Sequence, residues 1–191
     1  MADFKKFPIL AETAHQYATE VLVLADAMGD APVTLVEVMQ DFLRIVQTPI
    51  IAGGFAVAHH GFVRGTVDID VVAIDSRISE IESFKKLGYK HETVRISCGV
   101  IDLLSRSGKG VDFIHLDDDA FLKSLQLRTV AGLMLNQPVR VVSLEDLIIM
   151  KLIASRGRKG LKDQLDLEHL LVLEHDHVYV AKWKTHFKLE D

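Results

Sequence analysis

The feature that most constrains the fold is an aliphatic stretch at 67–74 in which Asp68 and Asp70 alternate with apolar residues. A period of two predicts a β-strand and places both carboxylates on one face of that strand. Two carboxylates about 7 Å apart along a strand repel each other unless a cation lies between them. A hard divalent cation such as Mg²⁺ would supply that charge, and a solvated strand face is the structural alternative.

A second feature lies just upstream, where Gly53 and Gly54 follow a short apolar strand at 50–51 and open a helix predicted over 55–60. Glycines at such a junction let backbone N–H groups approach a phosphate, and a helix N-terminus favours the negative charge. An ordinary strand-to-helix corner is the structural alternative. The two glycines therefore indicate a phosphate-binding turn only in combination with Asp68 and Asp70.

A third carboxylate, Asp112, lies between Val111 and Phe113 in another predicted strand at 111–116. A lone carboxylate inside an apolar strand is costly to bury unless it is paired or bound to a metal. We therefore expect Asp112 beside Asp68 and Asp70, on an adjacent strand.

The remaining pattern places helices around this strand-rich middle. The further predicted helices cover 9–28, 33–46, 76–87, 143–154 and 161–174, and the further strands cover 90–97, 100–105 and a hairpin at 128–142 that turns near Asn136. We expect an α/β (α+β) fold in which a mixed β-sheet is packed with helices. The expected organisation is an N-terminal helical extension at 1–46, a core at 47–142 and a C-terminal helical segment at 143–191, in one compact unit.

Composition excludes several classes of protein. With 22 Lys and Arg against 27 Asp and Glu, the net charge of −5 argues against a protein that coats nucleic acid. The single cysteine, Cys98, excludes an internal disulfide framework and a cysteine-rich zinc site. No run approaches the ~18 apolar residues of a membrane span, so we expect a cytoplasmic protein with no membrane partner.

These residues support a resemblance that covers about 48–172. Gly53-Gly54, a short helix, the run Gly-Phe-Val-Arg-Gly-Thr-Val-Asp-Ile-Asp at 61–70 and a third aspartate resemble the nucleotidyltransferases of the DNA polymerase β superfamily. The closest likeness is to small bacterial nucleotidyltransferase-like proteins that include toxins of abortive-infection toxin–antitoxin systems. A later block, formed by Lys151, Lys162-Asp163 and Asp166-Leu167, is similar to the helical Lys…Lys-Asp-x-x-Asp-Leu pattern of the family.

The resemblance implies a role for each matching residue. Gly53 and Gly54 would contact the triphosphate of an NTP, Asp68 and Asp70 would hold one or two Mg²⁺ ions, and Asp112 would complete the metal site and act as general base. The implied reaction transfers an NMP from an NTP to an acceptor hydroxyl on an RNA end such as tRNA, on a protein or on a small molecule.

Four other residues keep two interpretations each. Arg64 either contacts a phosphate or tethers the turn before Thr66, and Lys151 either faces the nucleotide or extends along an apolar helix face. Asp163 and Asp166 share a helix face, and we expect them to pair with Lys162 or the basic loop at 156–159 rather than to contact substrate.

The alternative function is a non-catalytic nucleotide-binding module, or a toxin–antitoxin component that acts through a partner protein. Family members often place Ser beside the two glycines, whereas Phe55 follows them here. This departure and the acidic net charge keep the alternative open, whereas the three aspartates favour the enzyme.

Overall fold

The computed structural model describes residues 33–157 and 161–189. The helix predicted over 9–28 lies outside these residues. The described strands are β1 (Ile50–Ile51), β2 (Asp68–Val72), β3 (Lys90–Ile96), β4 (Gly99–Arg106), β5 (Lys109–Leu116), β6 (Val130–Met134) and β7 (Gln137–Val141). The described helices are α2 (Leu35–Ile45), α3 (Gly53–His59), α4 (Ile78–Lys86), α5 (Asp119–Arg128), α6 (Leu144–Gly157), α7 (Leu161–Leu171) and α8 (His177–Phe187).

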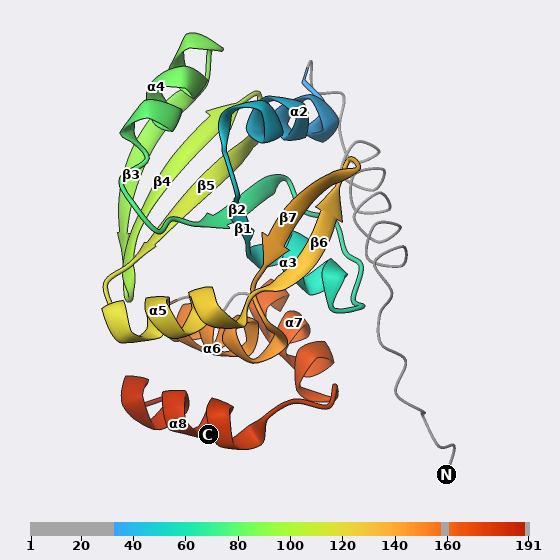
Figure 1. Cartoon of the computed structure of the whole chain (residues 1–191), viewed down its shortest axis with the longest axis vertical. Helices are drawn as coiled ribbons and strands as arrows, with labels where there is room; N and C mark the ends of the chain where they lie inside the picture. The colour runs from blue at the N-terminus through green and yellow to red at the C-terminus, as the bar shows by residue number, and fades with distance from the viewer. Residues whose placement is uncertain (1–32, 158–160, 190–191) are drawn as a thin grey trace.

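The seven described strands form one mixed sheet in the order β3-β4-β5-β2-β1-β7-β6 (Figure 1). β2 runs parallel to β5 and β1 runs parallel to β7, whereas the other neighbouring pairs are antiparallel. A mixed sheet packed with helices was predicted from the strand and helix pattern, and the structure confirms it.

The two faces of the sheet differ in what covers them. Asp70 on β2 is in register with Asp112 on β5, so both side chains lie on one face, which we call the aspartate face. The alternate residues of the same strands point to the opposite face and are buried; they include Ile69, Val71, Val111 and Phe113. On that opposite face Phe84 of α4 packs against Phe113 with ring centroids 6.2 Å apart.

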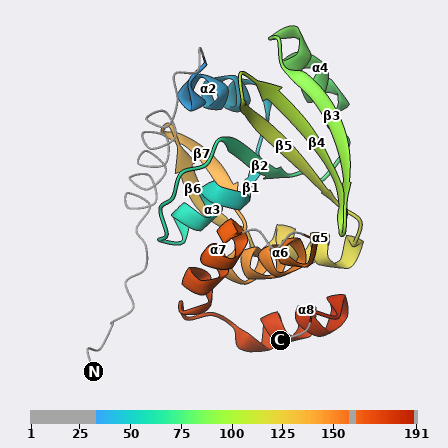
Figure 2. The same ribbon diagram turned by 180° about the vertical axis from the view of Figure 1, so that it is seen from behind.

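Helices α5 to α8 gather at the far end of the molecule from α2 and α4 (Figures 1 and 2). Among them α6 is central, because it packs against α3, α7 and α8. The Ser143 side chain caps the N-terminus of α6, because its Oγ accepts from the backbone N–H of Asp146 over 3.2 Å. This helix carries Lys151 toward the aspartate-bearing strands.

Two helices received no predicted bounds, and several boundaries differ. The sequence pattern did not indicate α5, and it placed α8 only within the helical segment at 143–191; these helices bury only Phe121 and Leu125, and Val180 and Trp183, respectively. A pair of buried residues produces a weak helical period, so tertiary packing decides these elements. In addition, α3 begins at Gly53 rather than near residue 55, and α7 ends at Leu171 rather than near residue 174.

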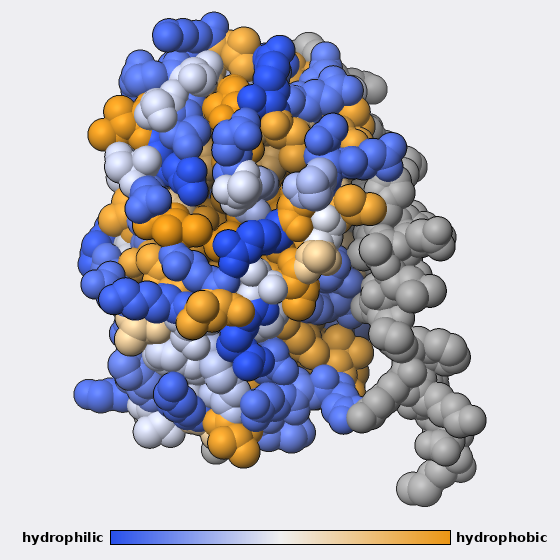
Figure 3. Space-filling model, viewed as in Figure 1, coloured by the Kyte–Doolittle hydropathy of each residue, from blue (hydrophilic) through white to orange (hydrophobic). Residues whose placement is uncertain are grey.

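The described surface mixes polar and apolar groups. In the view of Figure 3, hydrophobic residues are distributed in small groups among hydrophilic ones. Within the described ranges, no helix is both long enough and apolar enough to cross a membrane.

Candidate active site

The three predicted carboxylates lie on two neighbouring strands. In the parallel pair β2–β5, Asp68 is in register with Gly110 and Asp70 with Asp112. Neighbouring strands lie about 4.8 Å apart, so Asp70 and Asp112 are adjacent on the aspartate face. The expectation that Asp112 lies beside the first pair is thereby confirmed, whereas the catalytic role of each residue stays a prediction.

This crowding makes ionisation of the carboxyl groups unfavourable. Burial raises the pKa of Asp112 to about 8, and the nearby charges of Asp70 and Asp68 act in the same direction. Burial also raises the pKa of Asp70 to about 6, although the Lys151 ammonium opposes the rise. The pKa of Asp68 is raised by burial as well, against the attraction of Lys162. The nearby positive charges therefore do not offset the burial and mutual repulsion of these three carboxylates.

A dependence of stability on pH follows for the metal-free protein. Because the pKa of Asp112 is about 8 in the folded state and near 3.8 when unfolded, the unfavourable contribution of Asp112 develops as pH rises from about 4 to 8. With EDTA present, we expect Asp112→Asn to increase the free energy of unfolding by about 1–3 kcal/mol at pH 8 and by little at pH 4.5. Urea titrations at both pH values measure the difference, and a variant less stable than the parent at pH 8 would show that Asp112 is a structural hydrogen-bonding residue.

The Gly53-Gly54 turn fits closely against Asp70. Gly53 has a φ of +54°, and a Cβ atom added there would lie 1.7 Å from Asp70 Oδ2. The backbone N–H of Gly54 donates to the Asp70 carboxylate, and Ala52 N–H donates to the Asp70 carbonyl over 2.8 Å. The first position therefore needs glycine for two reasons, the backbone conformation and the space taken by Asp70.

Substitution can separate these two requirements. Gly108 also has a positive φ, +79°, but a Cβ there meets nothing within 4 Å. We expect Gly108→Ala to lower the free energy of unfolding by about 1–2 kcal/mol through backbone strain alone. Gly53→Ala should lower it clearly more, because the added Cβ also displaces Asp70. Chemical denaturation of both variants measures the gap, and equal losses would show that the contact between Gly53 and Asp70 is loose.

Arg64 and Lys151 meet on one buried carboxylate, that of Asp166. Arg64 donates from Nε and Nη2 to the two oxygens of Asp166 over 2.6 and 2.7 Å, and Lys151 Nζ lies 2.7 Å from Asp166 Oδ2. Lys151 also donates to Asp163 over 2.7 Å. The Asp166 side chain is fully buried, and these partners hold its pKa below the usual range although burial acts in the opposite direction. This arrangement ties the loop before β2 to α6 and α7.

The structure bears on two of the alternatives left open by the sequence. Arg64 also donates to the Gly65 carbonyl over 3.1 Å, so it tethers the turn, whereas its contact with a phosphate stays a prediction. Asp163 and Asp166 do form ion pairs, and the partners among the described residues are Lys151 and Arg64. Helical spacing pointed to Lys162 instead, because spacing identifies neighbours on the same helix, whereas these partners come from α6 and a distant loop. Residues 158–160 of the basic loop lie outside the described residues.

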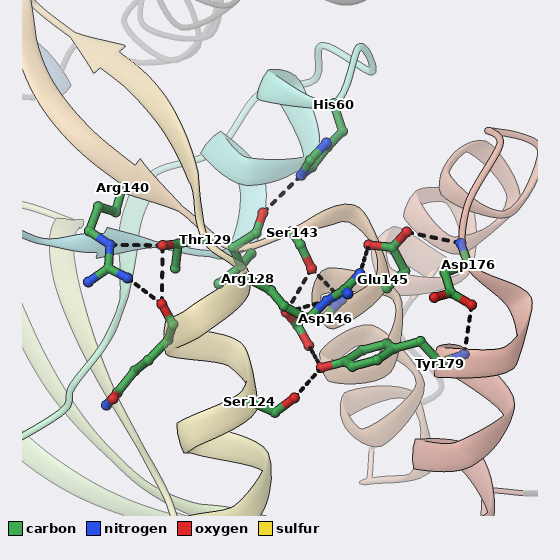
Figure 4. Close-up of polar contacts among 12 residues, drawn as sticks. His60, Ser124, Arg128, Thr129, Arg140, Ser143, Glu145, Asp146, Asp176 and Tyr179 are labelled. Atoms are coloured by element: carbon green, nitrogen blue, oxygen red, sulfur yellow. Dashed lines mark hydrogen bonds and ion pairs between the residues drawn. The ribbon is translucent and has the colours of Figure 1, made fainter.

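Another buried carboxylate, Asp146, has a structural environment (Figure 4). Its oxygens accept from Tyr179 Oη over 2.5 Å and from Ser143 Oγ over 2.7 Å. Arg128 pairs with the adjacent Glu145 over 2.9 Å. These contacts join α6 to α5 and α8, so Asp146 holds the helices together rather than taking part in the site.

The donor set of the site suits a hard divalent cation. Within residues 33–157 and 161–189, no three Asp, Glu, His or Cys side chains are already gathered as a metal-binding group. Mg²⁺ does not require such a group, since one or two carboxylates together with substrate phosphates commonly hold it. Asp68, Asp70 and Asp112 offer carboxylates whose pKa values are raised by burial, and a cation would relieve their mutual repulsion. These residues therefore fit the predicted ion.

Comparisons with known proteins show a fold likeness without a sequence match. No family model matches the sequence, and no curated protein matches it. The solution structure of the antibiotic-resistance factor ANT(2'')-Ia has a TM-score of 0.58 and 16% identity, covering 81% of this chain and 89% of that chain. The crystal structure of ANT(2'')-Ia in complex with adenylyl-2''-tobramycin also has a TM-score of 0.58, with 18% identity over 80% of this chain and 96% of that chain. At these identities the likeness concerns the fold, and the described chain has the mixed-sheet nucleotidyltransferase fold.

Proposed function

We propose that the protein transfers an NMP from an NTP to an acceptor hydroxyl with the help of Mg²⁺. The observation that carries the proposal is the set of three carboxylates on β2 and β5 beside a glycine turn that leaves no room for a side chain. The nucleotidyltransferase fold supports it. The implied setting is the cytoplasm.

In this proposal, the residues divide the work by position. Gly53 and Gly54 present backbone to the triphosphate, and Asp68 and Asp70 hold Mg²⁺, with Asp112 completing the metal site. When bound, the ion neutralises charge on the transferring phosphate and on the leaving pyrophosphate. The Lys151 ammonium partly offsets the rise in the pKa of Asp70. It therefore adds positive charge on the side of the site where Asp70 lies.

Asp112 has the second task, which is proton transfer. The acceptor oxygen forms a bond to the α-phosphorus, the bond from that phosphorus to the bridging oxygen breaks, and pyrophosphate leaves. Asp112 accepts the hydroxyl proton, a role that needs the carboxylate form. At pH 7 this form requires a neighbouring positive charge, because burial raises the pKa of Asp112 to about 8 without one.

The non-catalytic alternative, including a toxin–antitoxin interaction module, loses part of its support. Phe55 replaces the serine often found beside the glycines, yet its side chain is 3% exposed and lines a small apolar cavity with Ile51 and Val141. It therefore packs into the core. The turn lacks a hydroxyl, but Phe55 does not obstruct it.

The first test is metal-dependent nucleotide binding. Calorimetry with a non-hydrolysable NTP should give heat of binding in Mg²⁺ and little in EDTA, because the carboxylates alone repel the triphosphate. Asp68→Asn and Asp70→Asn should each weaken binding at least tenfold, and Asp75→Asn, an exposed aspartate beyond β2, is the matched control. Equal affinity with and without Mg²⁺ would exclude the metal-dependent site. Incubation with each labelled NTP and host lysate would then show which molecule receives the label.

A further inference from the structure

The aspartate face continues beyond Asp112 onto β4 and β3. In the antiparallel register, Asp112 is paired with Leu103 on β4, and Leu103 is paired with Glu92 on β3. The next row on this face places Ile101 beside Val94. Leu103, Ile101 and Val94 therefore form an aliphatic strip next to Asp112.

This aliphatic strip is partly open. Each of its three side chains has intermediate exposure, since α4 packs on the opposite face of the sheet. A cavity of about 280 Å³ lies at the β3–β4 turn, and its lining includes Ser97 and Cys98 of that turn and Ile153 and Arg156 of α6. Four residues of strand separate Leu103 from Gly99 at this turn, which is about 13 Å.

The position of the strip suits an acceptor. In-line attack places the acceptor oxygen and the leaving pyrophosphate on opposite sides of the α-phosphorus. If the glycine turn and β2 hold the triphosphate, the acceptor has to approach Asp112 from the side of β4. Leu103, the register partner of Asp112, is then the first residue that it meets.

We infer that the aliphatic strip binds the acceptor, and that the acceptor is a small uncharged or cationic molecule that carries a hydroxyl. This inference rests on the proposed nucleotidyl transfer. It assigns to Leu103 and Val94 the selection of that acceptor.

Charge supports this class of molecule over an RNA end. Among the residues that the structure describes, the strip, its two ends and the neighbouring contacts of Asp166 include more carboxylates than Lys and Arg side chains. Eight carboxylates, Asp68, Asp70, Asp112, Glu92, Asp117, Asp118, Asp163 and Asp166, stand against six cationic side chains, Lys90, Arg95, Arg156, Lys162, Lys151 and Arg64. Some of these carboxylates are already paired: Asp117 with Arg95, Asp118 with His186, and Asp163 and Asp166 with Lys151 and Arg64. A polyanion is repelled by this surplus, and the strip offers no aromatic side chain on which a base could stack.

The test uses neighbouring residues on opposite faces of the edge strand β3. Val94→Lys adds bulk and charge to the strip, whereas Thr93→Lys places the same side chain on the other face, where Thr93 contacts Asp102. Calorimetry in magnesium buffer without nucleotide measures the binding of three probes: tobramycin as a cationic hydroxyl compound, maltotriose as a neutral one and a 12-nucleotide RNA. Label transfer from NTP is measured in parallel.

We expect the parent to bind at least one of the two small probes, and to bind the RNA at least tenfold more weakly. Val94→Lys should weaken binding of the small probe at least fivefold and Thr93→Lys less than twofold, with both variants keeping the melting temperature and NTP affinity of the parent. Preference for RNA, no binding of either small probe, or equal effects of the two lysines would each overturn the inference. If the parent binds a small probe but does not bind NTP, the result would instead contradict the proposed function.

Discussion

Replacing Asp112 with asparagine is expected to reduce nucleotidyl transfer at least 100-fold while leaving NTP affinity within a few-fold of the parent. The amide oxygen of asparagine can still contact a metal, but the amide nitrogen cannot accept the proton of the acceptor hydroxyl. General-base assistance typically contributes ~10²–10⁴-fold to a rate. Because the loss concerns a step after binding, it should reduce the turnover rate and spare the affinity.

Label transfer and calorimetry on the same two proteins measure these quantities, with Asp75→Asn as a control for the removal of one exposed carboxylate. The control should transfer label at the rate of the parent. If Asp112→Asn transfers label as fast as the parent, Asp112 is not the base. A parent that binds NTP and transfers no label to any acceptor would instead support a binding module.

The carboxylate cluster could be predicted from the sequence because strand geometry limits the choices. The period of two fixes Asp68 and Asp70 on one face, and the cost of burying a lone carboxylate brings Asp112 to the neighbouring strand. The register of β2 and β5 agrees with this reasoning. Local rules sufficed here because each strand carries its own polarity pattern.

The partners of Asp166 could not be predicted in the same way. Its contacts come from Arg64, 102 positions earlier in the chain, and from Lys151 on another helix. No local spacing records such a pairing. The helical Lys…Lys-Asp-x-x-Asp-Leu pattern singles out Asp166 but does not name its partners, and the burial of Asp166 depends on how α7 packs. The aliphatic strip could not be predicted for a related reason. In the sequence alone, Leu103 cannot be distinguished from a core residue, because its place beside Asp112 depends on the order of the strands in the sheet.

Asp166 therefore leads to the largest expected effect on stability. Its carboxylate is fully buried and neutralises both Arg64 and Lys151, whose side chains are 16% and 12% exposed. Removing one partner of a buried ion pair typically costs 3–5 kcal/mol because the remaining charge stays desolvated. We expect Asp166→Ala to lower the free energy of unfolding by about this amount. Asp163→Ala, which removes a partner of the same Lys151 from a more exposed position, should cost about 1 kcal/mol or less.

Urea denaturation of the two variants tests the difference, and a loss below about 1 kcal/mol for Asp166→Ala would mean that water reaches the pair.

A third variant separates stability from function. Replacing the three most buried members of this cluster by apolar residues, as Arg64→Met, Lys151→Met and Asp166→Leu together, should recover most of the lost stability, because the carboxylate that remains, Asp163, is 24% exposed and reaches water. If Lys151 contributes its charge to the triphosphate, this stable variant should still bind NTP at least tenfold more weakly than the parent. Parent-like affinity would show that Lys151 and Arg64 serve the fold alone, and that the glycine turn and the three aspartates bind the nucleotide without them.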